Sequence, residues 1–222
     1  MVEIRLMRTK EGENPSVAAR RLLASALETA YGIPAASCLV EKDEKGKPCL
    51  AGRPDLHISI SHSGSYAACA FGDKPVGIDI EMWRTHPKWQ RIVDKMHPRE
   101  REAMTRLCGG TISRDTAEPV RQFCDLWVRK ESFLKAMGTG FATPLDRFYV
   151  EFRKGSDVSD AVKKNAMKVP CIIQNINHKQ YLCRLLSVKD EGYTAALCIE
   201  SLDKSLQEGE LFSTLEVEEI EE

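Results

Sequence analysis

The sequence predicts an α+β protein made of two similar lobes, each a small, mostly antiparallel sheet packed on one long helix. Each half of the 222-residue chain has one strong helix pattern and a group of short alternating segments typical of strands. In addition, Tyr66–Cys69 and Tyr193–Ala196 resemble one another, as an internal duplication would produce. We therefore expect a pseudo-dimer with an N-terminal lobe at residues 1–103, a C-terminal lobe at residues 104–207 and an acidic tail at residues 208–222.

Composition and charge argue against several classes of protein. The chain is 42% hydrophobic and 29% charged, which is ordinary for a globular domain. Its net charge of -1 argues against general nucleic-acid binding, because phosphate contacts need a surplus of Lys and Arg. No apolar signal core or membrane-spanning run is present, and the eight cysteines form no C-x-x-C pair. We expect a cytoplasmic protein with free thiols and no membrane partner.

The N-terminal half reads as one helix among strands. Residues 2–8 alternate as a strand, and Asn14 precedes a helix that runs to about Tyr31, where Gly32 ends it. A short strand near residues 38–41 leads into a polar turn. Three successive strands then follow, joined by turns that contain glycine: residues 56–61, 66–71 and 76–81.

The C-terminal half begins with a helix pattern near residues 97–100 and a loop rich in Gly, Ser, Thr and Pro. The strongest helix of the chain, Val120–Met137, ends at Gly138. The acidic last segment of the chain, residues 208–222, is predicted to be a solvated tail or a weak terminal helix. The strands of this half are predicted at residues 148–152, 171–174, 181–188 and 193–199.

Two carboxylates share one face of the strand at residues 76–81. Asp79 and Glu81 alternate with apolar residues, so they lie about 6–7 Å apart along the strand. Like charges at that distance repel unless a cation lies between them, and Mg²⁺ prefers such oxygen ligands. The alternative is a strand edge that faces solvent.

The helix Val120–Met137 provides a third carboxylate. Glu131 shares an apolar stripe with Trp127 and Leu134, while Asp125, Arg129 and Ser132 lie on the far side. A carboxylate on an apolar face is costly unless it is paired or binds a metal. Glu131 is therefore either a metal ligand or the partner of Lys135, one turn further along the helix.

Residues 58–64 end a strand in a Ser/Gly turn. Its hydroxyls, its free N–H groups and the imidazole of His62 suit phosphate oxygens, and Lys47 before Pro48 adds a cation. One alternative is a β-turn whose serines satisfy their own backbone. Another is a hydrolase that uses Ser61, His62 and Asp79, although neighbouring strand residues point to opposite faces and no G-x-S-x-G elbow is present.

Four motifs together resemble the 4′-phosphopantetheinyl transferases, specifically the larger, monomeric surfactin-synthetase type. They are Gly-Lys-Pro at residues 46–48, Ile-Ser-His-Ser-Gly at 60–64, G-x-D-x-E at 77–81 and W-x-x-K-E-S-x-x-K at 127–135. The resemblance implies Mg²⁺-dependent transfer of 4′-phosphopantetheine from coenzyme A to a serine of an acyl or peptidyl carrier protein. Adenosine 3′,5′-bisphosphate would be released, Mn²⁺ would be a possible substitute metal, and the site would lie in the cleft between the lobes.

The resemblance also implies roles for individual residues. Glu131 would accept the proton of the carrier serine, and Lys135 would contact the pyrophosphate. Because Gly77 has no side chain and shares a face with Asp79 and Glu81, we also expect it to leave room for the diphosphate. Glu100 matches a recurrent acid of less certain role. The implied metal ligands and catalytic residues are Asp79, Glu81, Glu131 and Lys135, and the implied coenzyme A contacts are Lys47, Pro48, Ser61, His62, Lys130, Arg20 and Arg21, the last two near the 3′-phosphate.

One segment departs from the family pattern. Members commonly carry a basic cluster between the first strand and the first helix, but here that connection is short, Arg8–Asn14. We expect the carrier to dock over residues 108–120 and the nearby Arg99, Arg106 and Phe141. Two other hypotheses remain open: a Mg²⁺-dependent nucleotide pyrophosphohydrolase with the same three carboxylates, and a carrier-binding module without turnover.

Overall fold

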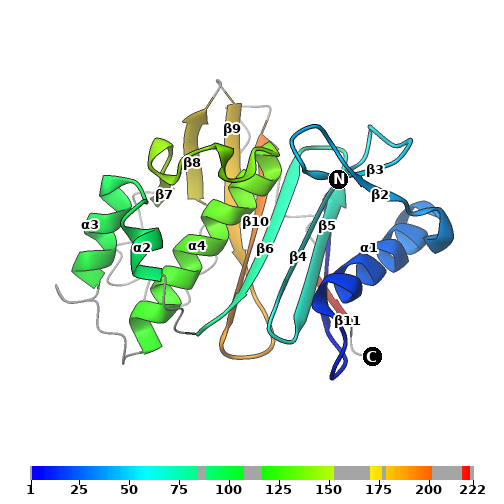
Figure 1. Ribbon diagram of the computed structural model, residues 1–222, viewed down its shortest axis with the longest axis horizontal. Coiled ribbons are helices and arrows are strands. Elements are labelled where there is room, and N and C mark those ends of the chain that lie inside the picture. The colour runs from blue at the N-terminus through cyan, green and yellow to red at the C-terminus, as the bar shows by residue number, and fades with distance from the viewer. Residues whose placement is uncertain are drawn as a thin grey trace.

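A computed structural model describes residues 2–84, 89–107, 117–152, 171–176, 179–201 and 217–220 (Figure 1). The predicted α+β class is confirmed: a four-stranded sheet has the order β11-β1-β5-β4, a five-stranded sheet has the order β6-β10-β9-β8-β7, and β2 and β3 form a hairpin. All pairings are antiparallel except that of β1 with β11. Within this part of the chain, no helix combines the length and apolar character needed to cross a membrane.

The helices and strands have the following bounds. The strands are β1 (Val2–Arg8), β2 (Val40–Lys42), β3 (Pro48–Leu50), β4 (His57–Ser63), β5 (Tyr66–Gly72), β6 (Val76–Met82), β7 (Val150–Phe152), β8 (Cys171–Ile176), β9 (Lys179–Leu186), β10 (Tyr193–Ser201) and β11 (Val217–Ile220). The helices are α1 (Pro15–Tyr31), α2 (Trp89–Val93), α3 (Pro98–Leu107) and α4 (Ala117–Met137), with 3-10 turns η1 (Ala35–Ser37), η2 (Gly140–Ala142) and η3 (Leu145–Arg147).

The helix α1 begins and ends as predicted. The side chain of Asn14 accepts hydrogen bonds from the backbone N–H groups of Ser16 and Val17, which otherwise lack partners in a first turn. Gly32 closes the helix in the left-handed region at φ 63°. The buried face of α1 packs on β4 and β5 in one apolar cluster.

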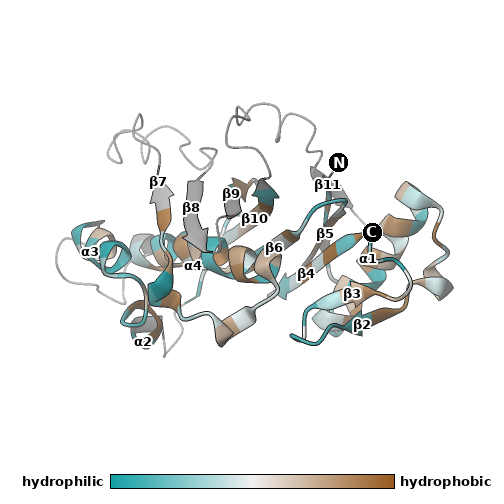
Figure 2. Cartoon of the chain, turned by 90° about the horizontal axis from the view of Figure 1, so that it is seen from above, coloured by the Kyte–Doolittle hydropathy of each residue, from teal (hydrophilic) through white to brown (hydrophobic). Residues whose placement is uncertain are grey.

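The helix α4 crosses the face of β6 and β10 (Figure 1). Its far side, expected to be polar, is also enclosed: Asp125 accepts a hydrogen bond from Thr194 of β10, and Ser132 is fully buried. Figure 2 shows the contrast between α3, which is largely hydrophilic, and α4, where hydrophobic and hydrophilic residues alternate around the helix. Polar residues of α4 therefore contribute to the core.

Gly77 does not provide space for a ligand, so that expectation is wrong. A Cβ at this position would overlap the carbonyl oxygen of Ser132 and the amide nitrogen of Ala136. The backbone of α4 already fills the space beside Gly77. Glycine is needed here because a helix and a strand approach closely.

The two sheets meet along β4 and β6, which run side by side without backbone pairing (Figure 1). Apolar residues of both sheets form one cluster, which includes Ile4, Ala68, Ile78 and Leu197. β6 lies in the predicted N-terminal lobe by sequence, yet it pairs with β10. The structure thus joins the two halves of the chain through a sheet as well as through a core.

The expectation of a solvated tail or a terminal helix is wrong for Val217–Ile220. These residues form β11, which pairs in parallel with β1. A strand edge leaves N–H and C=O groups unpaired, and a distant segment can satisfy them. The remaining residues of the predicted tail lie outside the described part of the chain, and so does most of the predicted docking loop, residues 108–120.

Candidate active site

A pocket of about 380 Å³ lies where β4, β6 and α4 converge near the start of α1. It brings together six of the residues that the sequence singles out, from three separate elements. Its lining is Ser16, Ile60, Ser61, His62, Asp79, Ile80, Glu81, Trp127, Glu131, Lys135 and Phe141. Ser16 and Trp127 were not predicted as site residues. Trp127 shares the stripe of α4 with Glu131, four residues away, and that spacing was a usable signal; nothing in the pattern of α1 marked Ser16.

Asp79 is held by two donors at one oxygen. The ammonium of Lys135 and the hydroxyl of Ser61 each lie 2.7 Å from Oδ1 of Asp79. Asp79 is only 6% exposed, so the alternative of a solvent-facing strand edge is wrong. Because Ser61 donates directly to Asp79, with no His62 between them, the arrangement also lacks the relay of a Ser-His-Asp hydrolase.

Glu131 lacks the partner that the simplest alternative gave it. Lys135 bonds to Asp79 and to the carbonyl of Ile78, so the alternative in which Glu131 pairs with Lys135 along the helix is not observed. Oε1 of Glu131 is buried and has no hydrogen-bond partner in the described part of the chain. Burial, together with the nearby charges of Asp79 and Glu81 and partly offset by Lys135, raises the pKa of Glu131 to about 7.

The residues of this pocket fit a hard divalent cation. Three carboxylates line one space, and the unpartnered oxygen of Glu131 is the kind of group that a cation would satisfy. Both donors to Asp79 bind Oδ1, and no described residue donates to Oδ2. Among the described residues, no three His, Cys, Asp or Glu side chains lie close enough together to hold a metal ion as they stand, so the three carboxylates share the pocket without being gathered around one point. The match to Mg²⁺ is one of donor type and charge, with Lys135 providing positive charge beside Asp79.

Glu81 is contacted by a residue that sequence reasoning missed. The hydroxyl of Ser63 donates to Oε1 of Glu81 at 3.0 Å, and Nε of Arg84 lies 3.9 Å from the same oxygen. Ser63 follows Ser61 at the period of a strand, so the two hydroxyls lie on one side of β4. The two-residue spacing between Ser61 and Ser63 was the sequence signal that could have identified Ser63 as a residue of the site.

Five predicted coenzyme A contacts, namely Lys47, Pro48, Arg20, Arg21 and Lys130, do not line this pocket. The ammonium of Lys47 donates to the carbonyls of Ala136, at 3.0 Å, and Val76, at 3.4 Å, and Pro48 begins the short strand β3. Arg20 is exposed on α1, and Arg21 forms an ion pair with Glu13 at 3.2 Å. Lys47 thus links a hairpin to the end of α4 in this structure.

Lys130 is also enclosed away from the pocket. Its side chain is fully buried, and its ammonium lies 2.7 Å from Oε2 of Glu100 and 3.0 Å from the carbonyl of Phe148. Glu100 in turn accepts from the N–H groups of His97 and Val150. The pair joins α3, α4 and β7, which gives Glu100 a structural role. Burial lowers the pKa of Lys130.

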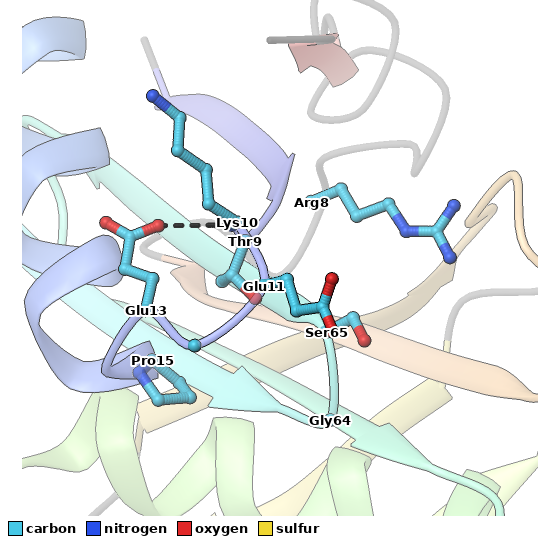
Figure 3. A pocket seen from close by; sticks show the side chains of 9 residues that line it. Arg8, Thr9, Lys10, Glu11, Glu13, Pro15, Gly64 and Ser65 are labelled. Carbon is cyan, nitrogen blue, oxygen red and sulfur yellow. Dashed lines mark hydrogen bonds between the residues drawn. The ribbon is translucent and has the colours of Figure 1, made fainter.

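A second hollow, of about 440 Å³, is formed by the connection between β1 and α1 and the turn between β4 and β5 (Figure 3). Arg8 and Lys10 extend in different directions there, and the backbone N–H of Lys10 donates to Glu13 (Figure 3). Glu11 and Glu13 line the same hollow. The short connection thus carries mixed charge in place of a basic cluster.

Comparison with known proteins defines the class. Residues 75–198 match the model of the 4′-phosphopantetheinyl transferase superfamily. The chain is 30% identical over 189 residues to the 4′-phosphopantetheinyl transferase Sfp of Bacillus subtilis (strain 168), covering 85% of this chain and 75% of that protein. It is 32% identical over 194 residues to another 4′-phosphopantetheinyl transferase of Bacillus subtilis, with the same coverage.

A more distant relative comes from an animal. The L-aminoadipate-semialdehyde dehydrogenase-phosphopantetheinyl transferase of Xenopus laevis is 31% identical over 144 residues, covering 61% of this chain and 47% of that protein. The chain therefore belongs to the 4′-phosphopantetheinyl transferase superfamily, and it is a transferase enzyme. Within that superfamily it is of the Sfp type.

Proposed function

We propose that this enzyme transfers the 4′-phosphopantetheine group from coenzyme A to a serine of an acyl or peptidyl carrier protein. The apo carrier becomes the holo carrier, and adenosine 3′,5′-bisphosphate is released. The observation that carries the proposal is the convergence of Glu131 and Lys135 from α4 with Asp79 and Glu81 from β6 in one pocket. These residues belong to the two most specific motifs of the sequence, G-x-D-x-E and W-x-x-K-E-S-x-x-K.

The proposed reaction is an attack on a pyrophosphate. The carrier serine Oγ forms a bond to the β-phosphorus of coenzyme A, and the bond between that phosphorus and the bridging oxygen of adenosine 3′,5′-bisphosphate breaks. Glu131 takes the serine proton, directly or through a water molecule. Lys135 neutralises negative charge on the phosphate oxygens, as catalysis of phosphoryl transfer requires.

Asp79, Glu81 and Glu131 would hold Mg²⁺ in this proposal. When bound, the metal would stabilise charge on the pyrophosphate oxygens and offset the three carboxylates. Ser61 and Lys135 orient Asp79 from one side, which supports its role as a ligand through the remaining oxygen. His62 lines the same pocket, where its imidazole would contact the phosphates of coenzyme A.

We also propose that the pocket marks the boundary between two similar lobes, residues 1–103 and 104–207. Support comes from the lining, which draws on β4 and β6 of the first and on α4 of the second. We also propose a monomeric enzyme, because the two motifs that supply the carboxylates, G-x-D-x-E and W-x-x-K-E-S-x-x-K, lie on the same chain and line the same pocket.

One experiment tests the proposal. The enzyme is incubated with coenzyme A, Mg²⁺ and an apo carrier protein, and the carrier is analysed by mass spectrometry. We expect a phosphopantetheine mass increment that disappears with a chelator or with a serine-to-alanine carrier. Consumption of coenzyme A at the same rate without a carrier would instead indicate a pyrophosphohydrolase, and binding of the carrier without modification would indicate a non-catalytic module.

A further inference from the structure

The edge of β6 that faces β4 is satisfied by side chains. β6 pairs with β10 on one side only, and β4 pairs with β5, so the two neighbouring strands exchange no ladder hydrogen bonds. Buried backbone groups need partners, and here serine hydroxyls of β4 accept from the N–H groups of β6. The three contacts are Ile78 N to Ser59 Oγ at 3.0 Å, Ile80 N to Ser61 Oγ at 3.3 Å, and Met82 N to Ser63 Oγ at 3.1 Å.

The three serines differ in where their own hydroxyl hydrogen is directed. Ser61 donates to Asp79 at 2.7 Å, and Ser63 donates to Glu81 at 3.0 Å. The residue of β6 that corresponds to these acids beside Ser59 is Gly77, which has no side chain. Ser59 therefore makes the same backbone contact without a carboxylate.

We propose that Ser63 is a positioning residue that fixes the carboxylate of Glu81 for the divalent cation. The inference rests on the proposed function, in which Glu81 is a metal ligand. The backbone N–H of Met82 holds the hydroxyl of Ser63, so its hydrogen is directed at Oε1 of Glu81. A hydroxyl held in this way restricts the rotation of a carboxylate that is still partly exposed.

Ser63 is not placed to contact coenzyme A. It is buried at 6% exposure and does not line the pocket, whereas its neighbour His62 does. Its effect on the metal must therefore pass through Glu81. Ser61 has the same geometry toward Asp79, but it also lines the pocket, so its replacement would disturb two functions at once.

The test compares Ser63→Ala, Ser63→Thr and Ser59→Ala with the wild type. Mn²⁺ binding is measured directly by electron paramagnetic resonance of the free ion, and thermal unfolding is recorded for each metal-free protein. We expect Ser63→Ala to weaken Mn²⁺ binding about tenfold, the usual lower range for loss of a group that orients a ligand. Ser63→Thr retains the hydroxyl and should restore binding. Ser59→Ala should lower the melting temperature as Ser63→Ala does, with unchanged Mn²⁺ affinity.

The outcomes separate this inference from the proposed function. Wild-type affinity in Ser63→Ala, or an equal loss of affinity in Ser59→Ala, would overturn the positioning role while the metal site stands. Failure of the wild type to bind Mn²⁺ would overturn the metal assignment and this inference with it. In the supporting case, the Mg²⁺ concentration for half-maximal transfer should also rise in Ser63→Ala, with KM for coenzyme A at saturating metal unchanged.

Discussion

Asp79 and Glu131 differ in how the protein stabilises their charge, although the proposed function makes both of them ligands of one metal ion. Asp79 accepts from a hydroxyl and an ammonium, so its charge is stabilised by the protein itself. Glu131 has a buried oxygen with no hydrogen-bond partner among the described residues, and its pKa is raised to about 7 by burial and by its acidic neighbours. The two residues should therefore respond differently to the loss of charge.

Replacing each acid by its amide distinguishes catalytic from structural effects. Both Glu131→Gln and Asp79→Asn should reduce the rate of transfer at least about 100-fold, since each removes charge from the pocket. Only Asp79→Asn should lower the free energy of unfolding, by about 1–3 kcal/mol, because it weakens two hydrogen bonds to a buried charge. Glu131→Gln should leave the metal-free protein equally stable or more stable. Transfer kinetics and urea unfolding measure the two effects, and near-wild-type turnover of either variant would contradict the assignment.

Lys47 should give the protein a distinctive dependence on pH. Burial lowers the pKa of Lys47 from 10.5 to about 8. The unfolded chain therefore holds this proton more tightly than the folded one, so the contribution of Lys47 to stability rises with pH between about 8 and 10.5. The rise should amount to about 1–3 kcal/mol.

The comparison of Lys47→Met with the wild type isolates this contribution, since all other titrating groups are common to both. The difference in free energy of unfolding, wild type minus variant, should increase from pH 8 to pH 10 in urea titrations. Lys45→Met, an exposed neighbour in the same turn, is the matched control. Parallel curves for the wild type and Lys47→Met would show that burial does not perturb this amine.

At the scale of elements, the packing of α4 on β6 depends on Gly77. A Cβ there would overlap backbone atoms of Ser132 and Ala136, which cannot move without displacing the helix that carries Glu131 and Lys135. Gly77→Ala should cost about 3 kcal/mol of stability, the upper end of the usual range for overpacking, because the added Cβ would meet backbone atoms. It should also lower transfer activity, because β6 and α4 hold opposite sides of the pocket.

A second glycine provides the control. Gly12 has φ +76° and open space around it, so Gly12→Ala adds only backbone strain of about 1 kcal/mol. Thermal unfolding of both variants should rank Gly77→Ala well below Gly12→Ala. A mild effect at Gly77 would mean that α4 and β6 can separate at little cost, and the close packing of α4 on Gly77 would then not limit stability.

Local patterns were enough to predict individual elements. Asn14, Gly32 and the apolar period between them predicted α1, and Gly138 predicted the end of α4. The alternation of β6 correctly placed Asp79 and Glu81 on one face. Such signals lie within the element or a few residues from its ends, so they can be recognised without knowledge of the tertiary structure.

Features that depend on packing between distant segments were not predictable in the same way. The pattern of β6 could not show that α4 covers Gly77, nor could the acidic composition of the last segment show that β1 would recruit β11. Lys47 was predicted as a cation for phosphate oxygens, held in place by Pro48, but its ammonium donates to carbonyls of β6 and α4. In each case, the contact is made with a segment that is distant in the sequence, so the local pattern of residues could not reveal it.

At the scale of the whole molecule, the chain is nearly neutral, with 32 basic and 33 acidic residues, so any attraction for an acidic carrier must be local. Arg99 and Arg106 lie on α3, and Phe141 is 69% exposed at the pocket. Arg99 bonds to Tyr149, whereas Arg106 is largely exposed beside Glu102. Arg106 is thus the better residue to reverse without disturbing the fold.

Arg106→Glu should raise KM for an acidic carrier about threefold or more and leave kcat unchanged, because an exposed charge on a docking surface acts mainly on encounter. Added salt should raise KM of the wild type more than that of the variant, since screening removes an attraction that the variant has already lost. Arg53→Glu makes the same change of charge on the connection between β3 and β4, where Arg53 is paired with Asp55. Steady-state kinetics with varied carrier and salt measure these effects. If Arg53→Glu raised KM as much as Arg106→Glu, net charge and not docking on α3 would govern carrier affinity.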